Sequence, residues 1–331
     1  MNIYHFEANE EDTTLIGGQG QCVAEALSPE TAAQYADAEI ISVFVGSNVN
    51  KEVFDAMPDL KLVVTRSTGF DHIDCSYAAS RNVAVANVPA YGSRTVAEFA
   101  MTLILGLSRK AFQANYHIKT GQAFDYAGFE GFNLQGKTLG VIGTGKIGQE
   151  IIKISKGFEM NVLAFDAFPN ENASQELGFK YTTLEDLQAN SDVVTLHVPY
   201  NKDTHHLINT ENVSKFKQGS ILVNTSRGEV IDTTALLTGL EQGIFSGVGL
   251  DVLEGEHELK DEMQLTLTGG NTHQDQLKVL LEDHILMDHP RVIITPHMAF
   301  FTKEAKAEIV RVTLDNIESF QTGSPKNIVK I

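Results

Sequence analysis

Four polar side chains lie just beyond the ends of apolar runs, and their types suit acid–base chemistry on a small anion. Arg227, Asp251 and His297 each fall within three residues of such a run, and Glu256 lies five residues after Asp251. A guanidinium pairs with a carboxylate and polarises an adjacent carbonyl. An imidazole donates a proton near neutral pH, and a neighbouring carboxylate favours its protonated form and fixes its orientation. The set predicts a site for a carbonyl next to a carboxylate.

Three of these side chains also have a purely structural alternative. Arg227 could pair with a surface acid, Glu256 could be a solvated loop residue, and His297 could be a buried histidine with satisfied hydrogen bonds. The carboxyl ends of strands in an open parallel sheet form a ligand crevice. We therefore expect the three to meet at one edge of a sheet.

A glycine-rich loop predicts a second function, the binding of a dinucleotide. Gly143, Gly145 and Gly148 form the pattern G-x-G-x-x-G between an apolar run and a helix-like segment, and Asp166 follows Gly148 by 18 residues. The glycines allow a tight turn, close approach of a pyrophosphate and close packing of helix on strand, and the helix N-terminus supplies free N–H groups. An acid at this distance accepts hydrogen bonds from the ribose and repels a 2′-phosphate. Residues 167–170 contain no Arg or Lys, so the loop predicts NAD rather than NADP.

Alternating elements indicate how these residues are positioned. Short, continuous apolar runs are typical of parallel strands buried on both faces, and helical patterns separate them. The predicted strands are residues 41–45, 62–65, 83–88, 138–142, 161–165, 192–198, 220–224, 247–252 and 291–295. The clearest predicted helices are residues 94–114, 146–156, 234–241 and 302–320. This rhythm predicts an α/β, doubly wound architecture.

Composition limits the classes of partner and location. The 331 residues carry a formal net charge of −18, so binding to nucleic acid or an anionic membrane is disfavoured, and the length predicts two domains. The two cysteines, Cys22 and Cys75, are expected to be reduced thiols. The acidic N-terminus and the lack of an apolar run of about 18 residues predict a cytoplasmic protein.

The ordered set of motifs resembles the D-isomer-specific 2-hydroxyacid dehydrogenases. It comprises VIGTGKIGQ, FDAFPN, LHVPYNKDTHHLIN, LVNTSRGEVIDTTAL, GLDVLEGE and ITPHMAFFT, and it extends from about residue 62 to the last helix. Among the members of that family, the chain is most similar to those that act on D-lactate. The combination is far more specific than the glycine loop alone.

The resemblance implies a fold of two doubly wound parallel-sheet domains. A Rossmann NAD domain, residues 98–298, is expected to be inserted in a flavodoxin-like substrate domain, residues 1–97 and 299–331. It also implies a homodimer, for which residues 96–107 are a candidate interface helix and equally a candidate core helix.

The resemblance further assigns roles to individual residues. Arg227, Glu256 and His297 match the catalytic residues. The matches to cofactor-binding positions are Gly143, Gly145, Lys146, Ile147, Gly148, Asp166, His197, Val198, Pro199, Thr204, Thr225, Ser226, Asp251 and His297. The matches to substrate-binding positions are Thr68, Gly69, Tyr91, Arg227 and Phe300. No residue is expected to bind a metal, because the histidines between 257 and 297 match no zinc spacing.

The implied activity is the reduction of a small 2-keto acid to a 2-hydroxy acid with NADH, with pyruvate and D-lactate as the expected pair. A glyoxylate or hydroxypyruvate reductase, or a broader 2-keto acid reductase, is the alternative. A more distant alternative is an NAD(H)-sensing, corepressor-like binding protein, because fold does not fix function. Arg94 and the long segment between Glu256 and His297 have no assigned role.

Overall fold

The computed structural model describes residues 1–121, 124–256, 259 and 274–330. The chain divides into two compact units. The smaller unit is made of Met1–Tyr91 and Phe301–Ile331, and the larger unit is Gly92–Phe300. These boundaries lie six residues before and two residues after the expected ones, so Phe300 belongs to the larger unit.

The smaller unit contains a parallel sheet in the order β2-β1-β3-β4-β5, the order of flavodoxin-like folds. Its strands are β1 (Ile3–His5), β2 (Gln21–Cys22), β3 (Ile40–Val43), β4 (Leu62–Thr65) and β5 (Ala84–Ala86), and its helices are α1 (Glu10–Ile16), α2 (Pro29–Ala32), α3 (Lys51–Ala56), α4 (Cys75–Ser80) and α13 (Lys303–Gln321). One face of the sheet packs on α2, α3 and α4, and the other packs on α13. The C-terminal tail returns to β5, where Ile328 bridges Ala86.

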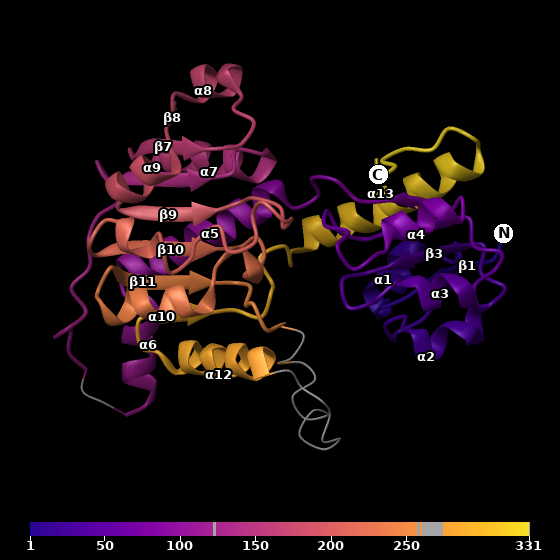
Figure 1. Ribbon diagram of the computed structural model, residues 1–331, viewed down its shortest axis with the longest axis horizontal. Coiled ribbons are helices and arrows are strands. Elements are labelled where there is room, and N and C mark those ends of the chain that lie inside the picture. The colour runs from indigo at the N-terminus through magenta and orange to yellow at the C-terminus, as the bar shows by residue number, and fades with distance from the viewer. Residues whose placement is uncertain (122–123, 257–258, 260–273, 331) are drawn as a thin grey trace. The chain divides into compact units, whose positions relative to one another are not determined.

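The larger unit contains a seven-stranded parallel sheet in the order β12-β11-β10-β9-β6-β7-β8 (Figure 1). The strands are β6 (Thr138–Ile142), β7 (Asn161–Phe165), β8 (Lys180–Tyr181), β9 (Val193–Leu196), β10 (Ser220–Asn224), β11 (Phe245–Leu250) and β12 (Val292–Ile294). The chain starts in the middle with β6, winds outward to β8, and then crosses to β9 on the other side. This doubly wound order places a switch point between β6 and β9, where ligands bind in such sheets.

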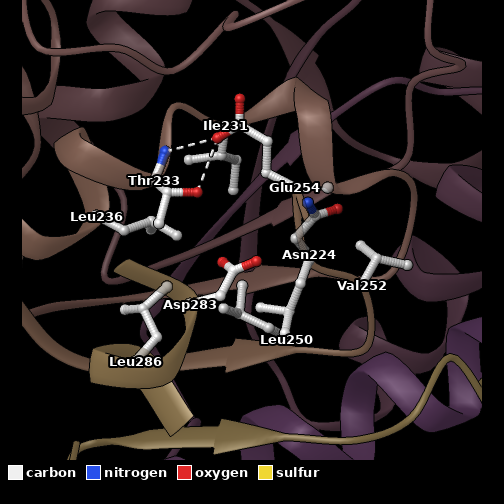
Figure 2. Close-up of a pocket in the computed structure, with 11 residues that line it drawn as sticks. Asn224, Ile231, Thr233, Leu236, Leu250, Val252, Glu254, Asp283 and Leu286 are labelled. Atoms are coloured by element: carbon white, nitrogen blue, oxygen red, sulfur yellow. Dashed lines mark hydrogen bonds between the residues drawn. The ribbon is translucent and has the colours of Figure 1, made fainter. Parts of the chain in front are cut away.

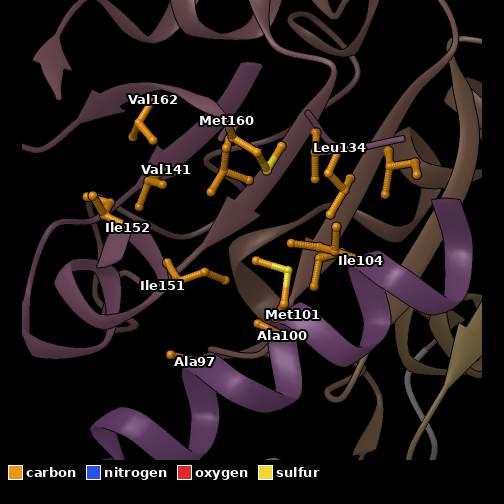
Figure 3. Packing of buried hydrophobic residues seen from close by; sticks show 14 of the residues in the cluster. Ala97, Ala100, Met101, Ile104, Leu134, Val141, Ile151, Ile152, Met160 and Val162 are labelled. Atoms are coloured by element: carbon orange, nitrogen blue, oxygen red, sulfur yellow. The ribbon is translucent and has the colours of Figure 1, made fainter. Parts of the chain in front are cut away.

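Helices cover both faces of this sheet. They are α5 (Ser93–Ser108), α6 (Ala111–Lys119), α7 (Lys146–Gly157), α8 (Glu171–Leu177), α9 (Leu184–Asn190), α10 (Thr233–Glu241) and α12 (Gln274–Asp288). Successive strand residues point to opposite faces. Thus Ile221 and Val223 pack in the core with α5 and α7, whereas Leu222 packs in the core with α9, α10 and α12. Figure 3 shows side chains of α5 and α7 in the first of these cores, such as Ile104 and Ile151.

The structure corrects several expected elements. The single helix expected over residues 94–114 is two helices, because Lys110 adopts a left-handed backbone conformation (φ 50°) that ends α5 and redirects the chain into α6. Residues 96–107 face mainly the core of their own unit. The strands β1, β2 and β8, of two or three residues each, were not anticipated from the sequence. Arg94 pairs with Glu98 at 2.6 Å.

Two further properties bear on the expectations from composition. No helix in the described part of the chain is long and apolar enough to cross a membrane. Cys22 and Cys75 are free and half-buried.

Candidate active site

The glycine loop has the geometry that a pyrophosphate requires. Gly143 has φ 94°, and a Cβ there would lie 2.8 Å from the backbone of His197, while a Cβ on Gly148 would collide with the carbonyl of Gly143. Packing within the protein therefore demands glycine at both positions. A Cβ on Gly145 would meet nothing within 4 Å. Gly145 is the N-cap of α7 and provides no side-chain cap, and Lys146 beside it is exposed, so the first N–H groups of the helix are open to an anion.

Asp166 lies directly beyond β7 and is tied to the glycine loop. Its Oδ2 accepts hydrogen bonds from the Thr144 N–H at 2.6 Å and the Thr144 hydroxyl at 2.9 Å, and its Oδ1 accepts from the Phe168 N–H at 2.9 Å. The hydroxyl of Tyr181 lies 2.7 Å from that of Thr144. These contacts fix a partly exposed carboxylate next to the loop, where the ribose of a dinucleotide would lie.

The segment after β9 closes on the same loop. The Val198 side chain would lie 2.9 Å from a Cβ on Gly143, and the His197 N–H donates to the Ile142 carbonyl. Burial lowers the pKa of His197 to about 3, so this imidazole is neutral at physiological pH. The Thr204 hydroxyl donates to the Pro199 carbonyl at 2.7 Å, which stabilises the turn between these two residues. Ile147, in the first turn of α7, is half-buried.

His297 and Glu256 form a direct pair. The His297 Nδ1 donates to Glu256 Oε2 at 2.9 Å, and the other carboxylate oxygen accepts from the Leu253 N–H at 3.0 Å. The two side chains are 29% and 21% exposed. Because a carboxylate only accepts, Nδ1 carries the hydrogen. Among the described residues Nε2 has no hydrogen-bond partner, so this nitrogen is available to a substrate. This arrangement can hold and deliver a proton.

Asp251 fixes the turn that carries His297. Its carboxylate accepts from the Thr295 hydroxyl at 2.5 Å, from the Met298 N–H at 3.0 Å and from the Ala299 N–H at 2.7 Å. The turn is strained, because His297 itself has φ 52°. Burial raises the pKa of Asp251, and the three hydrogen bonds oppose that rise. The sequence had indicated a cofactor contact for Asp251, and the structure shows in addition that it positions the loop of His297.

Arg227 reaches the same edge of the sheet from β10. Asn224, the last residue of β10, stabilises the loop by donating from its amide to the Arg227 carbonyl at 2.8 Å and accepting from the Ser226 N–H and hydroxyl. A Cβ on Gly228 would collide with the Leu253 carbonyl, so the loops after β10 and β11 touch. The Arg227 Nη1 donates to the Ser226 carbonyl at 2.8 Å. Thr225, in the same loop, is 8% exposed.

The residues of the smaller unit that are expected to bind substrate lie after β4 and β5. Thr68 is exposed, Gly69 is half-exposed, and the Thr68 hydroxyl donates to the Val88 carbonyl at 3.1 Å. Arg66, which opens this turn, is 3% exposed and donates to the carbonyls of Phe6 and Glu7, so its guanidinium serves the fold. Tyr91 is half-buried and ends the first of the two segments that form this unit. In the larger unit, the Phe300 Cβ would lie 3.8 Å from a Cβ on Gly92.

Two groups near the pair were not found by sequence reasoning. His206 Nε2 donates to Glu254 Oε1 at 2.6 Å, and Asp283, on α12, accepts from the Gly255 N–H at 3.0 Å. The spacing of Asp283 could have indicated that it is buried, because it lies midway between Leu280 and Leu286 on the buried face of its helix. Within the described ranges, no group of three or more acids, histidines or cysteines is arranged to hold a metal, and His257 and His273 lie outside those ranges.

Comparison with known proteins identifies the family. Residues 101–299 match the family model described as the D-isomer specific 2-hydroxyacid dehydrogenase, NAD binding domain. The chain is 38% identical over 305 residues to the D-lactate dehydrogenase kk1H of Curvularia clavata, covering 90% of this chain and 83% of that protein. It is 32% identical over 297 residues to a glyoxylate reductase of Korarchaeum cryptofilum, covering 88% and 83%.

Among solved structures, the chain resembles a D-lactate dehydrogenase from Aquifex aeolicus complexed with NAD and lactic acid. The TM-score is 0.88 at 35% sequence identity, and the match covers 99% of both chains. The glycine loop, the open N-terminus of α7 and the fixed carboxylate of Asp166 fit the same cofactor. The chain therefore belongs to the D-isomer specific 2-hydroxyacid dehydrogenase family, and its cofactor is NAD.

Proposed function

We propose that this protein is an NAD-dependent D-lactate dehydrogenase that reduces pyruvate to D-lactate. The observation that carries the proposal is the hydrogen bond of 2.9 Å between His297 and Glu256, beside the loop of Arg227. The similarity to D-lactate dehydrogenases from two organisms supports the choice of substrate. The resemblance assigns Tyr91 and Phe300 to substrate binding, and aromatic side chains in that role favour a small apolar substituent such as methyl.

The roles of the residues follow from their chemistry. NADH, when bound, supplies the hydride. Arg227 pairs with the substrate carboxylate and polarises the keto oxygen. His297 donates a proton from Nε2 to that oxygen, and Glu256 stabilises the protonated imidazole and holds its orientation. We assign the amides of Thr68 and Gly69 to the substrate carboxylate on the resemblance alone.

The test is NADH oxidation with pyruvate, hydroxypyruvate, glyoxylate and phenylpyruvate, each repeated with NADPH. We expect the highest kcat/KM for pyruvate with NADH and a product that only a D-lactate-specific enzyme reoxidises. His297→Ala should lower kcat by a factor of about 10²–10⁴, the usual contribution of a general acid. His284→Ala, which alters a half-buried histidine on α12, is the control. Near-normal turnover in His297→Ala would refute the assignment.

A glyoxylate or hydroxypyruvate reductase is the second candidate, supported by the similarity to a glyoxylate reductase. A higher kcat/KM for glyoxylate or hydroxypyruvate than for pyruvate would change the assigned substrate but leave the roles of Arg227, Glu256 and His297 unchanged. One methylene changes selectivity by only about 1–3 kcal/mol, so a broad 2-keto acid reductase is tested by the same panel. Binding of NADH without turnover of any acid would instead favour the corepressor-like alternative.

We further propose that the chain forms a homodimer through α6 rather than through α5. The side chains of Phe112, Tyr116 and Ile118 on α6 are 45–68% exposed, and Phe124 and Tyr126 beyond it are 91% exposed. Exposed apolar side chains in such number are typical of an interaction surface. Light scattering of Tyr116→Glu should show a monomer where the wild-type protein is a dimer, and an unchanged mass would refute this choice of surface.

A further inference from the structure

A buried carboxylate lies directly beneath the turn that carries Glu256. Asp283 projects from α12 and is 0% exposed. Its Oδ2 accepts a hydrogen bond of 3.0 Å from the Gly255 N–H, and its Oδ1 has no partner among the residues that the structure describes. Figure 2 shows the Asp283 carboxylate pointing into a small cavity whose lining includes Asn224, Leu250 and Glu254.

The cavity is too small to be a substrate site. It offers about 10 Å³, whereas pockets for small molecules have volumes of about 300–1,000 Å³. It lies under the loops after β10 and β11, on the inner side of the turn from Leu253 to Glu256. Burial of an acid costs folding free energy, which hydrogen bonding or loss of the charge reduces. The role proposed for His297 and Glu256 does not use this acid.

The turn itself is held at each of its residues. Gly228 packs against the Leu253 carbonyl. Glu254 accepts from His206 at 2.6 Å and from the Thr233 hydroxyl at 2.8 Å. The Gly255 N–H is bound by Asp283, and a Cβ on Gly255 would lie only 2.8 Å from Asp283 Oδ2, so the close approach depends on glycine. Glu256, the next residue, is the one that binds His297.

We propose that Asp283 is a positioning residue for the proton donor: by binding the Gly255 N–H it fixes the turn from Leu253 to Glu256, and thereby holds the Glu256 carboxylate against His297. The inference rests on the proposed function for its effect on turnover, but the anchoring of the turn stands on the geometry alone. Asp283 touches neither cofactor nor substrate in this role. A shift of the turn by about 1 Å is enough to cost up to 10²-fold in rate.

The surroundings of Asp283 favour its uncharged form. Burial is the main cause that raises its pKa to about 7, the Gly255 N–H opposes the rise, and the carboxylates of Glu254, Glu282 and Glu256 add to it. Of these, Glu254 is bound by His206 and Glu282 lies 3.6 Å from Lys278. A protonated Asp283 still accepts the Gly255 hydrogen bond through its carbonyl oxygen, without adding a fourth negative charge beneath Glu256.

The test compares two substitutions that keep the branch of the side chain at Cγ. Asp283→Leu removes both oxygens, whereas Asp283→Asn retains an oxygen that can accept from Gly255. The control is Asp288→Asn, an exposed acid on the same helix. Two quantities are measured: amide hydrogen exchange at Gly255 in the protein without cofactor, and the pH dependence of kcat and KM for pyruvate reduction.

We expect Asp283→Leu to speed exchange at Gly255, to lower kcat by roughly 10- to 100-fold, and to move the alkaline fall of kcat/KM to lower pH. The KM for NADH should not change, and Asp283→Asn should restore slow exchange and most of kcat. Wild-type exchange in Asp283→Leu would overturn the anchoring. Faster exchange with wild-type kcat and pH profile would overturn the positioning role.

If Asp283→Leu does not fold, Asp283→Ala replaces it in the same comparison with Asp283→Asn. Failure of the proposed function has a different signature, because the wild-type protein would then turn over no 2-keto acid while the exchange measurements still decide whether Asp283 anchors the turn.

Discussion

Asp283→Asn should make the thermal stability of the larger unit less sensitive to pH. The pKa of Asp283 is about 7 in the folded protein, against an ordinary value of 3.8. Between these values the unfolded chain releases a proton that the folded chain keeps, so the wild-type free energy of unfolding falls as pH rises. The contribution is fully present below about pH 4 and is lost by about pH 7. One pKa unit corresponds to about 1.4 kcal/mol, so the whole loss is about 4 kcal/mol.

The assay is scanning calorimetry of both proteins, without cofactor, at about pH 5.5 and about pH 8. The lower value stays above the isoelectric point of about 5.0, where proteins precipitate. The wild-type protein loses this stability between about pH 5.5 and the folded-state pKa of about 7, a range of about 1.5 pH units that corresponds to about 2 kcal/mol. For a unit of this size, 1 kcal/mol shifts Tm by about 2–4 °C. The Tm of Asp283→Asn minus that of the wild type should therefore be larger at the higher pH by about 4–8 °C.

Asp288→Asn makes the same substitution at an exposed position on α12. Its Tm should differ little from that of the wild type at both pH values. A Tm difference for Asp283→Asn that is equal at the two pH values would refute the reasoning, because Asp283 would then ionise in its ordinary range. A larger advantage at the lower pH would show that the carboxylate, and not the acid, is the form that stabilises the fold.

Four other substitutions test the site. Glu256→Gln keeps the size of the side chain but removes its charge, so the alkaline fall of kcat/KM for pyruvate reduction should move down by about one pH unit; an unchanged profile would contradict the pairing. Gly143→Ala should lower the Tm, because its Cβ would meet the backbone of His197. Gly145→Ala should keep the wild-type Tm but weaken NADH binding in a fluorescence titration. If the two substitutions changed Tm and NADH binding equally, the proposed geometry of the loop would be contradicted. Asp166→Ala should lower the preference for NADH over NADPH, measured as the ratio of the two kcat/KM values, by roughly 10-fold or more. The reason is that two hydrogen bonds to the ribose and the charge that repels a 2′-phosphate are lost. An unchanged ratio would exclude Asp166 as the residue that selects NADH.

Much of the larger unit could be predicted from local sequence. The runs at β6, β7 and β10 are continuous and apolar, and their bounds agree with the structure to the residue. The glycine loop between β6 and α7 was recognisable because its pattern encodes backbone conformation and close packing directly. The neighbourhood of Glu256 and His297 was predictable in outline, since the carboxyl ends of neighbouring parallel strands meet at one edge.

Other features depend on contacts between distant parts of the chain. The strands β1, β2 and β8 have two or three residues, too few for a periodic pattern to distinguish them from loops. The break between α5 and α6 carries no glycine or proline at the turning residue, and it is accompanied by close packing of Phe112 on Gly106. Such tertiary packing overrides local propensity.

The sequence by itself determined the family, the cofactor loop and the types of the reacting side chains, because these depend on residue identity and on short-range order along the chain. The tertiary structure decided which groups hold them in place. Asp251 clamps the turn of His297, and Asp283 binds the turn of Glu256 across 28 positions in sequence. Spacing could indicate that Asp283 is buried, but it gives the partner of neither carboxylate, because those partners come from distant parts of the chain.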